Sequence, residues 1–288
     1  MPRVITAGHV NWDVTLRVDR LPVADDEARI RSQRRSGGGS AANVAAALSA
    51  LSVPTGIVGS VGDDEPGLLA RRGLTAADVD TDGLRVVDGA TTVKYLLVDD
   101  DGEVAVLAND GANEAIGPDD VDPDRFTGVE AVHLTGQRPD TAVAIADAAR
   151  AADALVSVDP GRRVSDRDFS AVLDRADLVF LNDREATATD LADRPGRPVV
   201  TKRGEGGAVA RMPDGEYDHP GFDVAAVDTA GAGDAFAAGY LAATLDDRPA
   251  PEALAVANAC GALAAAEEGA RTTPTREAVD RLLADGSR

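Results

Sequence analysis

The residues best suited to chemistry lie in residues 227–245, which read VDTAGAGDAFAAGYLAATL. Small residues and glycines form the first part, and apolar side chains such as Phe236 and Leu241 then recur at helical spacing. We therefore expect a loop that turns directly into a helix. Gly231 and Gly233 let the backbone approach a ligand, and the unpaired amides of a first helical turn, together with the helix dipole, bind phosphate.

Asp234 stands at the beginning of this expected helix. A carboxylate that faces an anion site is unfavourable unless it does chemical work. Suitable work is to take the proton from a hydroxyl group that attacks the bound phosphate. The alternative is a simple helix cap, because aspartate is favoured in a first turn. The short motif GAGD does not distinguish these two interpretations.

Two longer strings carry a family resemblance. DTAGAGDAFAAG is similar to the C-terminal signature of the PfkB (ribokinase-like) carbohydrate kinases, and SGGGSAANVAAALSAL, at residues 36–51, resembles their N-terminal signature GG-x-x-x-N-x-A. The resemblance covers nearly the whole chain. It implies an α/β, ribokinase-like fold with a mostly parallel central sheet, helices on both faces and a small β-sheet lid. It also implies an ATP-dependent kinase that phosphorylates a hydroxyl of a sugar or sugar derivative, of the ribokinase, fructokinase or 2-keto-3-deoxygluconate kinase type.

The resemblance assigns roles around the transferred phosphoryl group and the acceptor. Asp234 becomes the general base, and the backbone amides of Gly231, Ala232 and Gly233 become the anion hole. The residues implied to hold the acceptor are Asn11, Asp13, Gly38, Gly39, Asn43, Lys94 and Arg162.

Residue spacing alone supports these acceptor roles unevenly. Asn11 and Asp13 point to the same side of an extended chain, but their spacing favours a turn at a strand end. The resemblance favours the sugar instead, because the first strand of these kinases ends in a similar N-x-D. Asn43 is a polar residue on an otherwise apolar helix, which tight helix packing does not explain. Lys94 suits an anionic substrate, although a solvated strand face is the commoner explanation.

The resemblance also implies a nucleotide site and two cation sites. Asn182 and Glu185 match the N-x-x-E motif, which places Mg²⁺ near Glu185, directly or through water, although the residues alone would favour an ordinary helix start. Asp228 matches the acidic position of a monovalent-cation site, so K⁺ is a candidate cofactor beside ATP and Mg²⁺. Lys202 replaces a common threonine, which leaves open which polar group meets the nucleotide. The nucleotide-binding set is Asn182, Lys202, Gly204, Gly207 and Asn258.

The elements that must position these residues alternate between strands and helices. Apolar strands separated by helices predict a parallel sheet covered on both faces, with ligands at the carboxyl ends of its strands. We expect a single domain over residues 1–288, with the lid built from about residues 12–35 and 91–109. The predicted strands are 4–10, 55–61, 131–135, 155–159, 178–182 and 198–201, and the predicted helices include 141–152, 169–175 and 185–191.

Composition restricts the partners of the chain. The formal net charge is −21, and Lys94 and Lys202 are the only lysines, so the surface should repel nucleic acid and anionic membranes. Because the acidic residues are spread along the whole chain, we interpret them as adaptation to a salt-rich cytoplasm. The sequence shows no long apolar run and begins with a strand pattern, which favours a cytoplasmic protein.

The acceptor is left open by the sequence. A sugar phosphate or a nucleoside is an alternative substrate, and a non-catalytic sugar- or nucleotide-binding module is an alternative to an enzyme. A Rossmann-type oxidoreductase is disfavoured because the first strand runs into NWD rather than into G-x-G-x-x-G. The oligomeric state is open between a monomer and a homodimer formed through the lid. Basic residues that could meet an acidic group on the acceptor are Arg29, Arg31, Lys94, Arg138 and Arg162.

Overall fold

The computed structural model describes residues 1–189, 191, 196–269 and 271–286. Its main sheet has nine strands in the order β13-β12-β11-β10-β9-β8-β1-β4-β5 among these residues. The strands from β11 to β5 run parallel, whereas β12 and β13 form an antiparallel hairpin at one edge. The strand bounds are Val4–Gly8 (β1), Thr55–Gly62 (β4), Leu84–Val87 (β5), Ala131–Thr135 (β8), Leu155–Asp159 (β9), Leu178–Asn182 (β10), Val199–Lys202 (β11), Ala208–Met212 (β12) and Gly215–His219 (β13).

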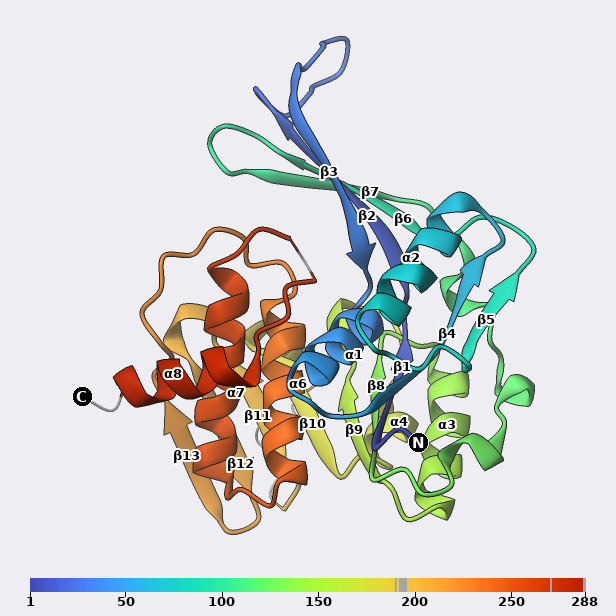
Figure 1. Cartoon of the computed structure of the whole chain (residues 1–288), viewed down its shortest axis with the longest axis vertical. Helices are drawn as coiled ribbons and strands as arrows, with labels where there is room; N and C mark the ends of the chain where they lie inside the picture. Colours follow the sequence, from blue (N-terminus) through green and yellow to red (C-terminus); the bar gives the residue numbers. More distant parts are fainter. Residues whose placement is uncertain (190, 192–195, 270, 287–288) are drawn as a thin grey trace.

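Helices cover both faces of this sheet (Figure 1). The alternation of side chains along β10 shows how: Phe180 packs in one apolar cluster with α1, α6 and α7, and Leu181 packs in another with α3 and α4. These near-continuous apolar strands are typical of a sheet that is buried on both sides. The helix bounds are Ser40–Ala50 (α1), Glu65–Ala76 (α2), Pro139–Ala151 (α3), Ser170–Leu173 (α4), Asp183–Thr189 (α5), Ala232–Leu245 (α6), Ala250–Ala265 (α7) and Arg276–Gly286 (α8).

A second, four-stranded sheet in the order β3-β2-β6-β7 stands away from the main body (Figure 1). Its strands are Asn11–Val18 (β2), Ile30–Gly38 (β3), Val93–Val98 (β6) and Val104–Ala108 (β7). β2 follows β1 after two residues, and β3 leads directly into α1. The small sheet is therefore joined to the carboxyl edge of the main sheet at the point where α1 begins.

The fold class expected from the sequence is confirmed, with a mostly parallel sheet, helices on both faces and a small separate sheet. The predicted strands 131–135, 155–159 and 178–182 match β8, β9 and β10. The expected alternation of strands and helices was wrong at residues 208–219, where β12 and β13 follow one another and form the antiparallel hairpin. The helix predicted at 185–191 ends at Thr189 in the structure, and residue 190 lies outside the described residues.

None of the helices in the described part of the chain combines the length and the apolar character that a membrane span requires.

Candidate active site

The start of α6 forms an anion site from backbone groups. Gly231 precedes the helix with φ 78°, a left-handed conformation that glycine adopts without steric cost. Within the described residues no side chain caps this first turn. The backbone amide of Ala232 donates to the carbonyl oxygen of Thr229 over 3.3 Å, whereas no such bond holds the amides of Gly231 and Gly233 within the described residues. These two amides are available to a phosphate group, and the helix dipole adds to the attraction. A Cβ added to Gly233 would lie 3.5 Å from Lys202 Nζ, so an ammonium group stands beside the same amides.

Asp234 and Asn43 bring the two sequence signatures into one site. Asn43 Nδ2, on α1, donates a hydrogen bond to Asp234 Oδ2, on α6, over 2.8 Å. Asp234 keeps some exposure to solvent, yet the protein around it desolvates the carboxylate and raises its pKa to about 6. The charge of Asp159 raises this pKa further, while Asn43 and Lys202 lower it in part. The result is a carboxylate that is ionised at neutral pH and still basic enough to accept a proton.

Lys202 lies at the carboxyl end of β11 and faces three acids. Its Nζ donates to Asp159 Oδ2, at the end of β9, over 2.5 Å, and the two side chains are only 15% and 13% exposed. Burial opposes the charge on Lys202, but the attraction of Asp159, Glu185 and Asp234 outweighs it and raises the pKa of the lysine. A firmly protonated ammonium group is thus held next to the anion site.

Asn182 and Glu185 form a reciprocal pair at the start of α5. The backbone N–H of Asn182 donates to Glu185 Oε2 over 2.9 Å, and the backbone N–H of Glu185 donates to the side-chain Oδ1 of Asn182 over 3.0 Å. This is the geometry of a helix cap, the alternative that the residues alone favoured. Burial is the main reason that the pKa of Glu185 is raised, and repulsion from Asp159 adds to it. Among the described residues no group of three or more His, Cys, Asp or Glu side chains could cage a metal.

The predicted acceptor residues Asn11 and Asp13 are buried at the start of β2, with 0% and 7% exposure. Asn11 Oδ1 accepts a hydrogen bond from Asn113 Nδ2 over 2.5 Å. Asn11 Nδ2 and Asp13 Oδ1 have no hydrogen-bond partner among the residues described. Burial raises the pKa of Asp13, and the charges of Lys94 and Arg271 oppose that shift. Lys94 is the β6 residue that pairs in register with Asp13.

The glycines of the predicted site serve the packing of the chain itself. A Cβ added to Gly38 would lie 2.0 Å from Asp13 Oδ2, and one added to Gly39 would lie 2.3 Å from the carbonyl oxygen of His9. In the predicted nucleotide loop, a Cβ at Gly207 would meet the carbonyl oxygen of His219 at 2.0 Å, whereas Gly204 borders open space. Close backbone packing is thus a sufficient reason for Gly39 and Gly207, whereas Gly38 leaves room for the side-chain carboxylate of Asp13.

Three further predicted residues are not joined to this cluster by any hydrogen bond in the described part of the chain. Arg162 is exposed in the short turn after β9. Asn258 is buried within α7, where its Nδ2 donates to the carbonyl oxygen of Leu254. The carboxylate of Asp228 accepts from the amides of Ala230 and Gly269 over 2.9 and 3.0 Å, which ties together the loops that flank α6 and α7.

Sequence reasoning missed Arg271, which contacts the site, and Gln137, which lies at the same edge of the main sheet. Arg271 donates from Nη2 to the carbonyl oxygen of Gly38 over 3.1 Å and from Nε to Asn43 Oδ1 over 3.5 Å, and burial lowers its pKa to about 10. Gln137 is 2% exposed just after β8, and neither of its amide atoms has a partner among the described residues. Its place directly after a predicted strand was the signal that could have identified it.

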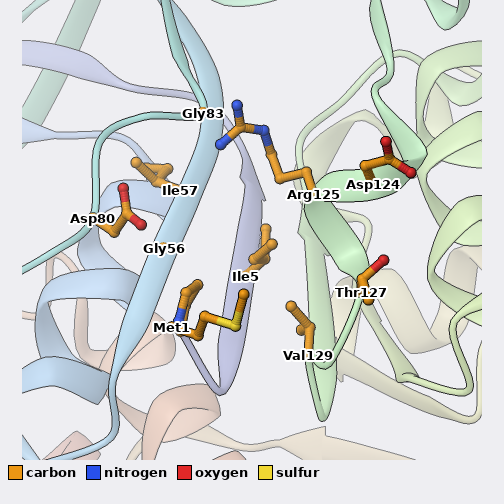
Figure 2. A pocket seen from close by; sticks show the side chains of 11 residues that line it. Met1, Ile5, Gly56, Ile57, Asp80, Gly83, Asp124, Arg125, Thr127 and Val129 are labelled. Carbon is orange, nitrogen blue, oxygen red and sulfur yellow. The ribbon is translucent and has the colours of Figure 1, made fainter.

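A separate cavity of about 200 Å³ lies at the other end of the strands (Figure 2). Ile5 and Gly56, near the beginnings of β1 and β4, border it together with Met1, Arg125 and Val129. No residue predicted for the site lines this cavity. Ligands of a parallel sheet bind at the carboxyl ends of its strands, so we place the active site at the edge that carries Asp234.

Known proteins resemble this chain over almost its full length. The ATP-dependent ribose-1-phosphate kinase of Halopiger xanaduensis is 60% identical over 99% of both chains, and the fructokinase of Klebsiella pneumoniae is 32% identical over 92% of this chain and 96% of its own. The structure of Arabidopsis thaliana ribokinase complexed with ribose and ATP superimposes with a TM-score of 0.88 at 25% identity, covering 98% of each chain.

These relatives decide between the enzyme and the non-catalytic binding module in favour of an ATP-dependent sugar kinase. The sequence model of the pfkB family carbohydrate kinases matches residues 1–277. The chain therefore belongs to the PfkB family of carbohydrate kinases.

Proposed function

We propose that this kinase transfers the terminal phosphoryl group of ATP to the primary hydroxyl of ribose 1-phosphate. The observation that carries the proposal is the 60% identity, over 99% of both chains, to an enzyme named for that substrate. In its ring form ribose 1-phosphate has one primary hydroxyl, on C5, which is its least hindered nucleophile. The products would be ribose 1,5-bisphosphate and ADP.

Asp234 acts as the general base in this proposal. The proton of the C5 hydroxyl passes to the Asp234 carboxylate while the hydroxyl oxygen attacks the terminal phosphorus of ATP. The bond from that phosphorus to the bridging oxygen breaks, and ADP leaves with the electron pair. The hydrogen bond from Asn43 fixes the orientation of the carboxylate, and the amides of Gly231, Ala232 and Gly233 stabilise the charge on the phosphoryl oxygens.

Lys202 and Glu185 act on the nucleotide side. The ammonium group of Lys202 lies beside Gly233, where it would offset negative charge as the phosphoryl group moves. Glu185 suits Mg²⁺ held through water, because Mg²⁺ keeps several waters and needs only one or two carboxylates beside the phosphates. When bound, Mg²⁺ would neutralise phosphate charge. The nucleotide is expected to lie along Asn182, Lys202, Gly204, Gly207 and Asn258.

The acceptor is expected on the other side of Asp234. The unpaired polar atoms of Asn11 and Asp13 suit the ring hydroxyls, with Asn43 and the backbone of Gly38 and Gly39 beside them. The small sheet would cover this site as a lid, and Lys94 would lie on it opposite Asp13.

We further propose a setting for the enzyme that follows from its charge. A net charge of −21 with two lysines supports work in a salt-rich cytoplasm, away from nucleic acid and membranes. Each oxygen of Asp228 already accepts a backbone amide but retains a lone pair, so K⁺ remains a candidate ligand there. The enzyme would work as a monomer or as a homodimer formed through the small sheet.

An assay of ADP release across a panel of acceptors tests the proposed substrate. The panel contains ribose 1-phosphate, ribose, fructose, 2-keto-3-deoxygluconate and a nucleoside, each with ATP and Mg²⁺ in high KCl. We expect kcat/KM for ribose 1-phosphate to exceed that for every other acceptor by about 10-fold or more. A higher kcat/KM for an unphosphorylated sugar would overturn the substrate assignment. Equal rates in KCl and NaCl would contradict the proposed K⁺ site at Asp228.

A further inference from the structure

Gln137 presents a buried amide for which the chain supplies no partner. Its side chain is 2% exposed, and both Oε1 and Nε2 lack hydrogen bonds among the residues described. A buried amide left unpaired is unfavourable, so such a group indicates a partner outside the polypeptide, either a water molecule or a ligand. Gln137 follows β8 at the carboxyl edge of the main sheet, the edge that carries Asp234.

His9 connects Gln137 to the acceptor site. The carbonyl oxygen of His9 lies against Gly39, and a Cβ added to Gly136 would lie 3.2 Å from His9 Nδ1. His9 Nε2 lies 3.6 Å from Glu114 Oε1, which is within ion-pair distance when the ring is protonated, and Nε2 has no shorter hydrogen bond in the described part of the chain. His9 therefore meets the residue before α1 through its backbone, while its ring lies between Gly136, the residue before Gln137, and Glu114.

Three guanidinium groups, those of Arg138, Arg163 and Arg167, form an arginine cluster beside Glu114. Arg138 donates from Nε and Nη2 to the carboxylate of Asp140 over 3.1 and 2.5 Å, and the other two bond to Glu114. Arg163 Nη1 and Arg167 Nη1 donate to Glu114 Oε1 over 2.9 and 2.7 Å, and Arg167 Nη2 donates to Oε2 over 3.1 Å. Arg138, the neighbour of Gln137, borders an open pocket of about 480 Å³ together with Glu114, Arg167 and Asp140.

The arginine cluster is suited to an anion. Three guanidinium groups face two carboxylates, those of Glu114 and Asp140, so positive charge prevails in a chain whose net charge is −21. His9 and the guanidinium groups of Arg167 and Arg163 lower the pKa of Glu114 to about 2, so it stays ionised and keeps the arginines in place. Each guanidinium has five N–H groups, and Glu114 uses only some of them.

We infer that Gln137 and the arginine cluster bind the phosphate group of the acceptor. This inference rests on the proposed function, because it requires an acceptor that carries a phosphate. The sugar would lie with its primary hydroxyl at Asp234 and its anomeric phosphate toward Gln137 and Arg167. The glutamine amide donates to a phosphate oxygen through Nε2, whereas a carboxylate at that position would repel the dianion.

Other basic residues near the acceptor are less suitable for this phosphate. The guanidinium of Arg271 already donates to the carbonyl oxygen of Gly38 and to Asn43. Arg31 is exposed on the small sheet and pairs with Asp100 over 3.3 Å. Arg271 also stands near Asp13, whose Oδ1 lacks a partner among the described residues, but that carboxylate would repel a phosphate, whereas Gln137 offers a neutral donor.

Steady-state kinetics of four variants test the inference. Arg167→Gln removes a guanidinium, and Gln137→Glu places a negative charge at the proposed phosphate site. Arg31→Gln tests the small sheet, and Arg175→Gln, which removes an exposed ion pair with Asp147, is the matched control. KM is measured for ribose 1-phosphate and for ATP in high KCl, and circular dichroism confirms that each variant is folded.

We expect Arg167→Gln and Gln137→Glu to raise KM for ribose 1-phosphate about 10- to 100-fold, with KM for ATP within about 2-fold of wild type. Arg175→Gln should match wild type. An unchanged KM for ribose 1-phosphate in both cluster variants, or an increase only in Arg31→Gln, would overturn the phosphate site while the proposed substrate stands. A wild-type enzyme that phosphorylates ribose but not ribose 1-phosphate would overturn both.

Discussion

Two acids at the carboxyl edge of the main sheet show opposite behaviour. The pKa of Asp234 is raised to about 6, mainly because the protein desolvates its carboxylate, and Asp159 repels it further. The pKa of Glu114 falls to about 2, because His9, Arg167 and Arg163 face it. The difference shows how one chemical group can serve as a base in one setting and as an ionic anchor in another.

The position of the counter-ions produces this difference. Glu114 accepts hydrogen bonds from two guanidinium groups, whereas Asp234 accepts one from the neutral amide of Asn43. Lys202 is close to Asp234 but bonds to Asp159. The Asp234 carboxylate therefore stays moderately basic. A direct ion pair with Lys202 would lower its pKa and weaken it as a base.

The largest expected effect comes from removing the proposed base. Asp234→Asn keeps the shape of the side chain but cannot accept the hydroxyl proton, so we expect kcat to fall about 10²-fold or more. ATP binding, measured by calorimetry, should stay close to wild type. Asp147→Asn, which changes an exposed aspartate on α3, is the control and should retain full activity. A kcat for Asp234→Asn near the wild-type value would exclude the base role.

A smaller loss is expected at Lys202. Lys202→Gln removes the cation beside the α6 amides and leaves Asp159 buried without its partner, so we expect kcat to fall about 10- to 100-fold. Lys202→Arg retains the charge and should recover part of the loss. A wild-type kcat in Lys202→Gln would show that this ammonium group does not act on the phosphoryl group.

The contrast between the two acids also predicts how stability changes with pH. The folded-state pKa of Asp234 is about 6, above its ordinary 3.8. The ionised carboxylate is therefore less favourable in the folded protein than in the unfolded chain. This destabilisation is complete above pH 6 and disappears below pH 3.8, where the group is protonated in both states. Asp234→Asn should therefore raise the free energy of unfolding by about 1–3 kcal/mol at pH 8 and hardly change it at pH 3.5. Chemical denaturation in high KCl measures both values, and equal effects at both pH values would contradict the raised pKa.

Glu114 should behave in the opposite way. Its folded-state pKa of about 2 lies below the ordinary 4.5, so its ionised form stabilises the fold above pH 4.5, and that contribution is lost as the pH falls toward 2.

The sequence predicted correctly those elements that a local residue pattern marks. Strands β8, β9 and β10 are short apolar runs between polar ends, and the two signatures place Asn43 and Asp234 at helix starts. It did not reach contacts made between distant segments. Arg271 meets Gly38 only because the loop after α7 folds back over α1, and no local pattern marks it. The β12–β13 hairpin was missed because its strands are short and its outer strand is polar.

The most direct test of Asp234 as the base is the pH dependence of kcat/KM for the acceptor, which reports the ionisations of the free enzyme, in wild type and in Asn43→Ala. We predict an acid limb with an apparent pKa near 6 in wild type. Because the Asn43 amide stabilises the ionised carboxylate, its loss should move that limb to higher pH. The phosphate of the acceptor also titrates near pH 6, but Asn43→Ala would not move that titration. A kcat/KM that is flat between about pH 5 and 8 would contradict Asp234 as the base, as would an identical limb in both proteins.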